Sequence, residues 1–218
     1  MNKKLKNFII SSFLILLSIV FTILVKVIDV RTIGANGSKV GFASLNKAVF
    51  DTLGVNMRWY HITDILGKFV ILIALFYAFI GILQLVKRKK ISKVDKEIVL
   101  LGIFYVVVAA IYAFFEKVVI NYRPILLDGK LEASFPSSHT MLVLCVCISA
   151  VLVNKRLFKN NYFKIFNVLL ILIAFVTIVG RLVSGVHWCS DIIGGVIISG
   201  ALLMTFYSFL CLLDDKKN

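Results

Sequence analysis

The segment IIGGVIISGALLMTFYSFLCLL, Ile192–Leu213, carries no charged side chain between Asp191 and Asp214. A bilayer core about 30 Å thick needs roughly 20 consecutive apolar residues of helix, so this segment predicts a membrane span. The fold predicted for the chain is all-α, a polytopic membrane protein built as a six-transmembrane-helix bundle. Five other stretches are long and apolar enough, or nearly so, to cross a bilayer: Phe8–Val25, Ile65–Val86, Ile98–Phe115, Ser138–Val153 and Ile165–Gly180.

The composition of the 218 residues excludes a soluble domain. Hydrophobic side chains make up 60% of the chain, charged ones 17%, and the mean hydropathy is +0.97. Soluble chains are about 45–50% apolar and about 25% charged. The same figures exclude a disordered chain, and four cysteines are too few for a disulfide scaffold of this length.

The net charge of +14 would suggest nucleic acid as a partner in a soluble protein, but here it predicts membrane orientation. Fifteen of the 25 basic residues fall on one side of the predicted spans, in short segments. We therefore expect a multi-pass protein of the plasma membrane with both termini cytoplasmic and no nucleic-acid partner. These fifteen residues are Lys3, Lys4, Lys6, Lys87, Arg88, Lys89, Lys90, Lys93, Lys96, Lys155, Arg156, Lys159, Lys164, Lys216 and Lys217.

Three connections then face outward: Asp29–Asp64, Glu116–Ser137 and Arg181–Asp191. The basic start of the chain resembles a secretory signal, but its apolar run exceeds the usual 7–15 residues, so we expect a retained first span. In the first outward connection, residues 44–51 suggest a short interfacial helix. Trp59 and Tyr60 are expected to anchor the next span at the membrane surface, since aromatic residues favour that level.

Residues suited to chemistry collect in the second and third outward connections. Pro136 suits a chain entering a helix, and Ser137 or Ser138 is a good N-cap, which puts His139 in the first turn of the fourth span. A helix N-terminus with free N–H groups and hydroxyls is a ready site for an anion. An ordinary capping sequence would explain the two serines but not His139.

The third outward connection contains Arg181, His187 and Asp191. Because His187 and Asp191 are four residues apart, a helical or turn-like backbone would let the carboxylate accept a hydrogen bond from the imidazole. Such a bond fixes the tautomer and leaves the other ring nitrogen free as a base or nucleophile.

This inventory of side chains fits phosphoryl transfer without a metal or other cofactor. Cations, hydroxyls and helix-end amides can bind a phosphoryl group of about −1.5 to −2 charge, while two histidines supply a nucleophile and a general acid. The outward connections have no dense Asp/Glu cluster for Mg²⁺ and no Cys/His spacing for Zn²⁺. The candidate phosphate-binding residues are Arg123, Arg181, Ser137, Ser138 and Lys117.

In order and spacing, these residues resemble the type 2 phosphatidic acid phosphatase superfamily, the membrane lipid phosphatases related to vanadium haloperoxidases. Arg123-Pro124 matches the end of the family's Lys–six residues–Arg-Pro motif, and Pro136-Ser-Ser-His139 matches Pro-Ser-Gly-His. The last motif, Ser-Arg–five residues–His–three residues–Asp, is matched at full spacing from Arg181 to Asp191. The resemblance implies one integral-membrane lipid phosphatase domain over residues 1–218, with its motif region at 116–191.

The resemblance also implies a role for each matched position. His187 would attack phosphorus and become a phosphohistidine, Asp191 would orient and stabilise it, and His139 would protonate the leaving oxygen. The phosphoryl oxygens would be held by Arg123, Arg181, Ser137 and Ser138.

The chain departs from the family pattern at three places. Ser138 replaces glycine, and Gly180 replaces serine. In the first motif Glu116 occupies the usual lysine position, and only five residues separate Lys117 from Arg123. At about 100° per residue this spacing puts the two side chains on different helical faces, so Lys117 can reach the phosphate only if the backbone before Pro124 is not helical.

The function expected is metal-independent hydrolysis of a lipid phosphate or diphosphate at the extracytoplasmic membrane face, through a phosphohistidine. Polyprenyl diphosphate, phosphatidic acid and phosphatidylglycerol phosphate all fit, and the sequence does not choose among them. The alternatives are a lipid phosphoryl transferase, a catalytically silent lipid-binding relative, and a non-enzymatic anion or lipid transporter. Transport is disfavoured because the spans have charges only toward their ends, whereas transporters place polar groups near the midplane.

Overall fold

The computed structural model describes residues 3–158 and 160–214; Lys159, Lys216 and Lys217, which the orientation argument counts, lie outside them. Six helices of the described residues are long and apolar enough to cross a membrane, which confirms the all-α, six-span fold of a multi-pass membrane protein. They are α1 (Lys3–Val27), α3 (Met57–Arg88), α4 (Lys96–Lys117), α5 (Ser138–Leu157), α6 (Asn161–Val183) and α7 (Cys189–Asp214). The shorter elements are α2 (Ala43–Leu53) and the 3-10 turns η1 (Ala35–Gly37) and η2 (Ile91–Lys93).

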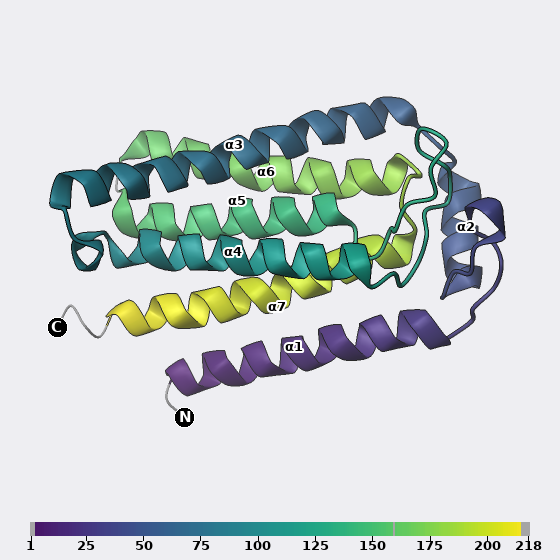
Figure 1. Cartoon of the computed structure of the whole chain (residues 1–218), viewed down its shortest axis with the longest axis horizontal. Helices are drawn as coiled ribbons and strands as arrows, with labels where there is room; N and C mark the ends of the chain where they lie inside the picture. The colour runs from purple at the N-terminus through teal and green to yellow at the C-terminus, as the bar shows by residue number, and fades with distance from the viewer. Residues whose placement is uncertain (1–2, 159, 215–218) are drawn as a thin grey trace.

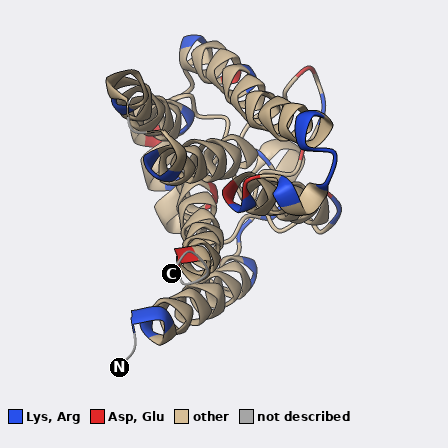
Figure 2. Cartoon of the chain, turned by 90° about the vertical axis from the view of Figure 1, so that its left-hand side faces the viewer, with Lys and Arg blue, Asp and Glu red and all other residues tan. Residues whose placement is uncertain are grey.

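The long helices alternate in direction along the chain (Figure 1). As a result, both ends of the described chain lie at one end of the bundle, and α2 gathers with the motif-bearing loops at the other (Figure 1). Figure 2 views the end near the termini and shows Lys and Arg on several of the helix ends there. The three connections expected on one side therefore do share one end of the molecule.

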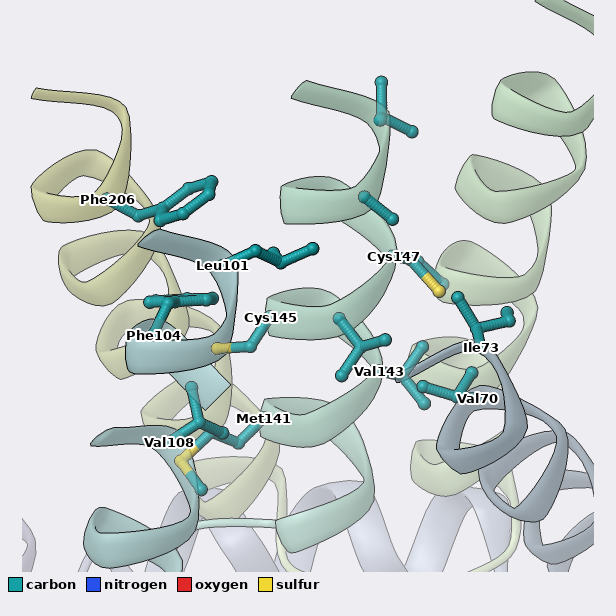
Figure 3. Close-up of a cluster of buried hydrophobic side chains, with 14 of the residues drawn as sticks. Val70, Ile73, Leu101, Phe104, Val108, Met141, Val143, Cys145, Cys147 and Phe206 are labelled. Carbon is teal, nitrogen blue, oxygen red and sulfur yellow. The ribbon is translucent and has the colours of Figure 1, made fainter. Parts of the chain in front are cut away.

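The centre of the bundle is α5, which packs against α3, α4, α6 and α7 and is the most buried of the spans. By contrast, α1 packs mainly against α7 and exposes much apolar surface, as expected of a helix facing lipid. Figure 3 shows part of the core around α5, with side chains that interdigitate from four helices: Val70, Ile73, Leu101, Phe104, Val108, Met141, Val143, Cys145, Cys147 and Phe206.

A buried polar chain ties three of these helices together in the half of the bundle away from the motif loops. The hydroxyl of Tyr77 on α3 donates to the side-chain oxygen of Asn154 on α5. The amide nitrogen of Asn154 in turn donates to Asn167 on α6 at 2.8 Å. Because hydrocarbon offers no replacement partners, these bonds favour one register of α3, α5 and α6.

The short helix expected over residues 44–51 is present as α2, which lies across the end of the bundle (Figure 1). Its buried Asn46 donates to the Gly41 carbonyl and to the Ser190 hydroxyl, both at 2.8 Å, and accepts from the Ser190 backbone N–H at 3.0 Å. These bonds attach α2 to the start of α7, next to the third motif.

Replacing Asn154 with alanine should destabilise the bundle by about 1–2 kcal/mol, because Tyr77 and Asn167 would lose their buried partner. The measurement is the thermal unfolding midpoint in detergent. Val106→Ala, at a position on α4 that is 70% exposed, is the matched control and should change the midpoint little. Equal midpoints for the two variants would contradict this account.

Candidate active site

Asp191, fully buried in the first turn of α7, holds the three motif segments together. Its Oδ2 accepts from the Trp188 backbone N–H at 2.9 Å, and its Oδ1 accepts from the Asn121 amide at 3.3 Å. Its backbone carbonyl accepts from the Ser137 N–H at 3.0 Å. Since Asn121, Ser137 and Trp188 belong to different motif segments, one buried residue fixes their relative positions.

The imidazole of His187 is held at both nitrogens. Its Nδ1 lies 3.1 Å from the Ser134 carbonyl oxygen. A carbonyl can only accept, so Nδ1 carries the hydrogen and Nε2 of the neutral ring has the free lone pair. Nε2 lies 3.0 Å from Nη1 of Arg123, a guanidinium donor.

The hydrogen bond expected from His187 to the Asp191 carboxylate is not formed. Their closest atoms, Nδ1 and Oδ2, are 3.7 Å apart. The spacing of four residues correctly predicted that the two side chains lie close together. The Asp191 oxygens, however, accept hydrogen bonds from Trp188 and Asn121, and the main-chain oxygen of Ser134 orients the His187 ring instead.

Two arginines from different elements have their side chains near the His187 imidazole. Arg123 donates through Nη1 to the Val186 carbonyl at 3.1 Å and through Nε to Glu132 at 3.0 Å. Arg181, in the last turn of α6, is 1% exposed, and its guanidinium carbon lies 5.1 Å from the centre of the Tyr60 ring. Among the described residues, Nε and Nη2 of Arg181 are buried and have no hydrogen-bond partner. A buried guanidinium without acceptors is costly, so these donors mark a place for anionic oxygens.

His139 lies in the first turn of α5, and its partners come from α3. Its Nε2 is 3.5 Å from Oδ1 of Asp64, whose Oδ2 is 2.9 Å from Nζ of Lys68. A Cβ on Gly67 would come within 2.8 Å of Cδ2 of His139. The group of Asp64, Gly67 and Lys68 was not predicted, because the first outward connection was expected to run as far as Asp64, whereas α3 begins at Met57. The signal was the spacing of Asp64, Gly67 and Lys68, which puts them on one helical face.

The three remaining candidates, Ser137, Ser138 and Lys117, occupy different positions relative to the site. Ser137 is buried as the N-cap of α5, and its hydroxyl accepts from the Thr140 N–H at 3.5 Å and from the Thr140 hydroxyl at 3.1 Å. Ser138 lines two adjoining cavities, one with His187 and one with His139. Lys117 ends α4 and is exposed, and residues 118–123 are not helical. Within the described residues, no hydrogen bond or ion pair links Lys117 to the other candidates.

The aromatic pair expected to anchor α3 also lies against Gly180 and Arg181 of the third motif. Tyr60 stacks on Arg181, and a Cβ on Gly180 would meet Trp59 at 2.8 Å and Thr63 at 2.6 Å. The contact with Arg181 is additional to the anchoring expected of Tyr60, which stays a prediction. The contacts also give a reason for glycine at 180, since the serine of the family pattern would have to displace α3.

Burial, followed by the positive charges of Arg123 and Arg181, holds the pKa of His187 well below its usual value of about 6.5. The hydrogen bond that the ring donates to the Ser134 carbonyl raises the pKa of His187, but it does not outweigh burial and the two arginines. His139 also contributes to the lowering, so its charge is within electrostatic reach of His187. The ring is thus kept neutral, as a nucleophile or base requires.

The lowered pKa of His187 predicts a specific loss of stability in acid. Below about pH 6.5 the unfolded chain binds a proton at this position and the folded chain does not, so the free energy of unfolding falls as the pH falls. The loss should approach about 1.4 kcal/mol per pH unit, down to the pKa of the folded state. Unfolding midpoints of the wild type and His187→Gln between pH 7.5 and 5 check this: the wild type should show the steeper loss, and parallel curves would contradict it.

Comparison with known proteins agrees with this arrangement. Residues 117–212 match the PAP2 superfamily, which confirms the resemblance inferred from the motifs. A solved structure with a similar fold is the transmembrane PAP2 type phosphatidylglycerolphosphate phosphatase from Bacillus subtilis, at 18% identity over 95% of this chain and 97% of that chain, with a TM-score of 0.63. At that identity the likeness shows the fold alone. None of the curated proteins matches the sequence significantly. The match to this superfamily supports phosphatase activity toward lipid phosphates.

Proposed function

We propose that residues 1–218 form a single domain that hydrolyses a lipid phosphate or diphosphate without a metal, at the extracytoplasmic face of the plasma membrane. The observation that carries the proposal is the buried Arg181, which lies close to Arg123 and His187 and whose Nε and Nη2 have no hydrogen-bond partner in the described part of the chain. Two guanidinium groups close to a neutral imidazole suit a phosphoryl group, because they stabilise its charge and leave the nucleophile unprotonated.

In the first step, Nε2 of His187 attacks phosphorus and the bond to the lipid oxygen breaks. The lone pair of Nε2 faces Arg123, and the proton on Nδ1 is held by the Ser134 carbonyl. The charge that develops on the phosphoryl oxygens is stabilised by Arg123 and Arg181. The product of this step is a phosphohistidine and a free lipid alcohol or lipid phosphate.

His139 serves both steps as the proton carrier. It gives a proton to the leaving oxygen in the first step and takes one from water as that water attacks the phosphohistidine. The role of Asp191 is indirect: it stabilises the turn that carries His187 through Trp188 and Asn121. We propose Ser138 as a phosphoryl-oxygen donor at the junction of the two cavities. Ser137 contributes to phosphate binding chiefly by capping α5. Lys117, exposed at the end of α4, is a further candidate for binding the phosphate.

A cavity of about 540 Å³ supports a lipid as the leaving group. It begins at Asp64, Ser138 and His139 and continues between α3, α4 and α5 along apolar side chains that include Ile71 and Val108. The polar end would receive the headgroup and the apolar part the chain, in contact with the acid that protonates the leaving oxygen.

The outward position of the site is proposed from the basic residues on the opposite connections. In a chain with Cys189→Ala and Cys211→Ala, a cysteine introduced by Lys130→Cys should react with a membrane-impermeant maleimide on intact cells. One introduced by Ser92→Cys, in the loop of η2, should react only after the cells are opened. Both positions are exposed, so the reverse pattern would invert the proposed orientation.

Two variants test the mechanism. His187→Ala should abolish phosphate release, because no phosphoenzyme can form. His139→Ala should lower kcat/KM about 10²–10⁴-fold for phosphatidic acid but far less for an aryl phosphate, because kcat/KM reports the phosphorylation step and that leaving group needs no acid. The assay is phosphate release in detergent from phosphatidic acid, phosphatidylglycerol phosphate and a polyprenyl diphosphate, with lipid products followed in parallel.

The same assay separates the alternatives. A phosphorylated lipid formed without free phosphate would identify a phosphoryl transferase. A purified His187→Ala protein that releases phosphate at the wild-type rate would remove the mechanism. Transport is disfavoured further because each spanning helix of the described residues runs without a break, whereas transporter sites lie on interrupted helices.

A further inference from the structure

We propose that Asp64 is a positioning residue for His139, the general acid of the proposed reaction. The inference rests on the proposed function and adds to it a residue outside the three motifs, from a helix that carries none of them. Three observations support it. The Asp64 carboxylate is shared between two partners, Gly67 has no side chain where the His139 ring lies, and charged groups surround His139.

The carboxylate of Asp64 is shared between Lys68 and His139. Oδ2 lies 2.9 Å from Nζ of Lys68, one turn further along α3, and Oδ1 lies 3.5 Å from Nε2 of His139. An exposed ion pair within one helix contributes little to stability. Its effect here is orientation, because Lys68 holds one oxygen and leaves the other directed at the imidazole. A separation of 3.5 Å is an ion-pair distance that a small side-chain rotation shortens to a hydrogen bond.

Gly67 lets the ring of His139 lie against the α3 backbone. A Cβ at this position would be 2.8 Å from Cδ2 and 3.1 Å from Nε2 of His139, but 3.9 Å from Cγ. The edge that carries Cδ2 and Nε2 therefore faces α3, and the edge that carries Nδ1 faces away from it. With Nε2–H directed at Asp64, Nδ1 is the nitrogen that gives the proton to the leaving oxygen and later takes one from water. Asp64 stays ionised throughout.

The charges around His139 give Asp64 a second effect. Arg123 and Arg181 approach from the loops and α6 and carry positive charge, whereas His187 stays neutral. From α3 come Asp64 and Lys68, and the groups of α4 that line the same cavity, Tyr105 and Tyr112, are neutral phenols. Within the described residues, Asp64 is the carboxylate at ion-pair distance from His139. Its negative charge opposes that of the arginines and so favours the protonated imidazole that the proposed acid step needs.

The test uses the full chain in detergent, with phosphatidic acid and p-nitrophenyl phosphate as substrates. Asp64→Asn should lower kcat for phosphatidic acid by about 10–100-fold, the range for residues that orient a reacting group, with KM changed less than about 3-fold. It should change kcat/KM for p-nitrophenyl phosphate by less than about 3-fold, because kcat/KM reports the phosphorylation step and that leaving group needs no acid. Asp64→Glu should recover part of the loss, and on a His139→Ala background Asp64→Asn should add almost nothing.

Asp51→Asn is the matched control, an exposed Asp on α2 that is also paired with a lysine four residues away, and it should match the wild type. Gly67→Ala keeps the carboxylate but displaces the ring, so it should reproduce the substrate-selective loss; Gly102→Ala, where a Cβ meets nothing within 4 Å, is its control. Equal losses of kcat/KM on both substrates, or a further loss on the His139→Ala background, would overturn the inference. A wild type inactive on every lipid phosphate would instead reject the proposed function, whatever Asp64 does.

Discussion

The site depends on the satisfaction of one buried carboxylate. Asp191 has no exposed surface, and a carboxylate removed from water is strongly destabilising unless hydrogen-bond donors surround it. Its donors come from Trp188 and Asn121, while its main chain binds Ser137. The bonds that stabilise this residue are thus the same bonds that bring three distant segments of chain to one place. Catalytic geometry and local stability have a common origin here.

Near Asp191, two arginine side chains bring positive charge into a region with little access to water. Arg181 is almost completely buried, stacked on Tyr60, and two of its nitrogens lack acceptors, while Arg123 is paired with Glu132 and adjoins His187. Such a group of cations is unfavourable by itself and becomes favourable with a bound anion, which is how a site can be selective for phosphate. It also keeps His187 neutral. The proposed general acid, His139, needs the reverse environment, and Asp64 of α3 supplies a carboxylate beside it.

The prediction of the fold succeeded because lipid imposes a strong and simple constraint. A stretch such as Ile192–Leu213 must satisfy its backbone internally, so length and hydropathy were enough to find all six spans. The ends of helices were less predictable, since the apolar run does not show where hydrogen bonding begins. For this reason α3 starts eight residues before Ile65, and Asp64 was assigned to a loop although it lies inside a helix.

What the sequence by itself determined was the number of spans, the end of the bundle at which the motifs gather, and the residue types there, because hydropathy and motif spacing are local properties of the chain. Only the tertiary structure decided which atoms meet. Nδ1 of His187 bonds to a carbonyl and not to Asp191, Tyr60 stacks on Arg181, and Asp64 faces His139 across Gly67. These contacts join residues of separate elements, and packing fixes them, so no local pattern could state them in advance.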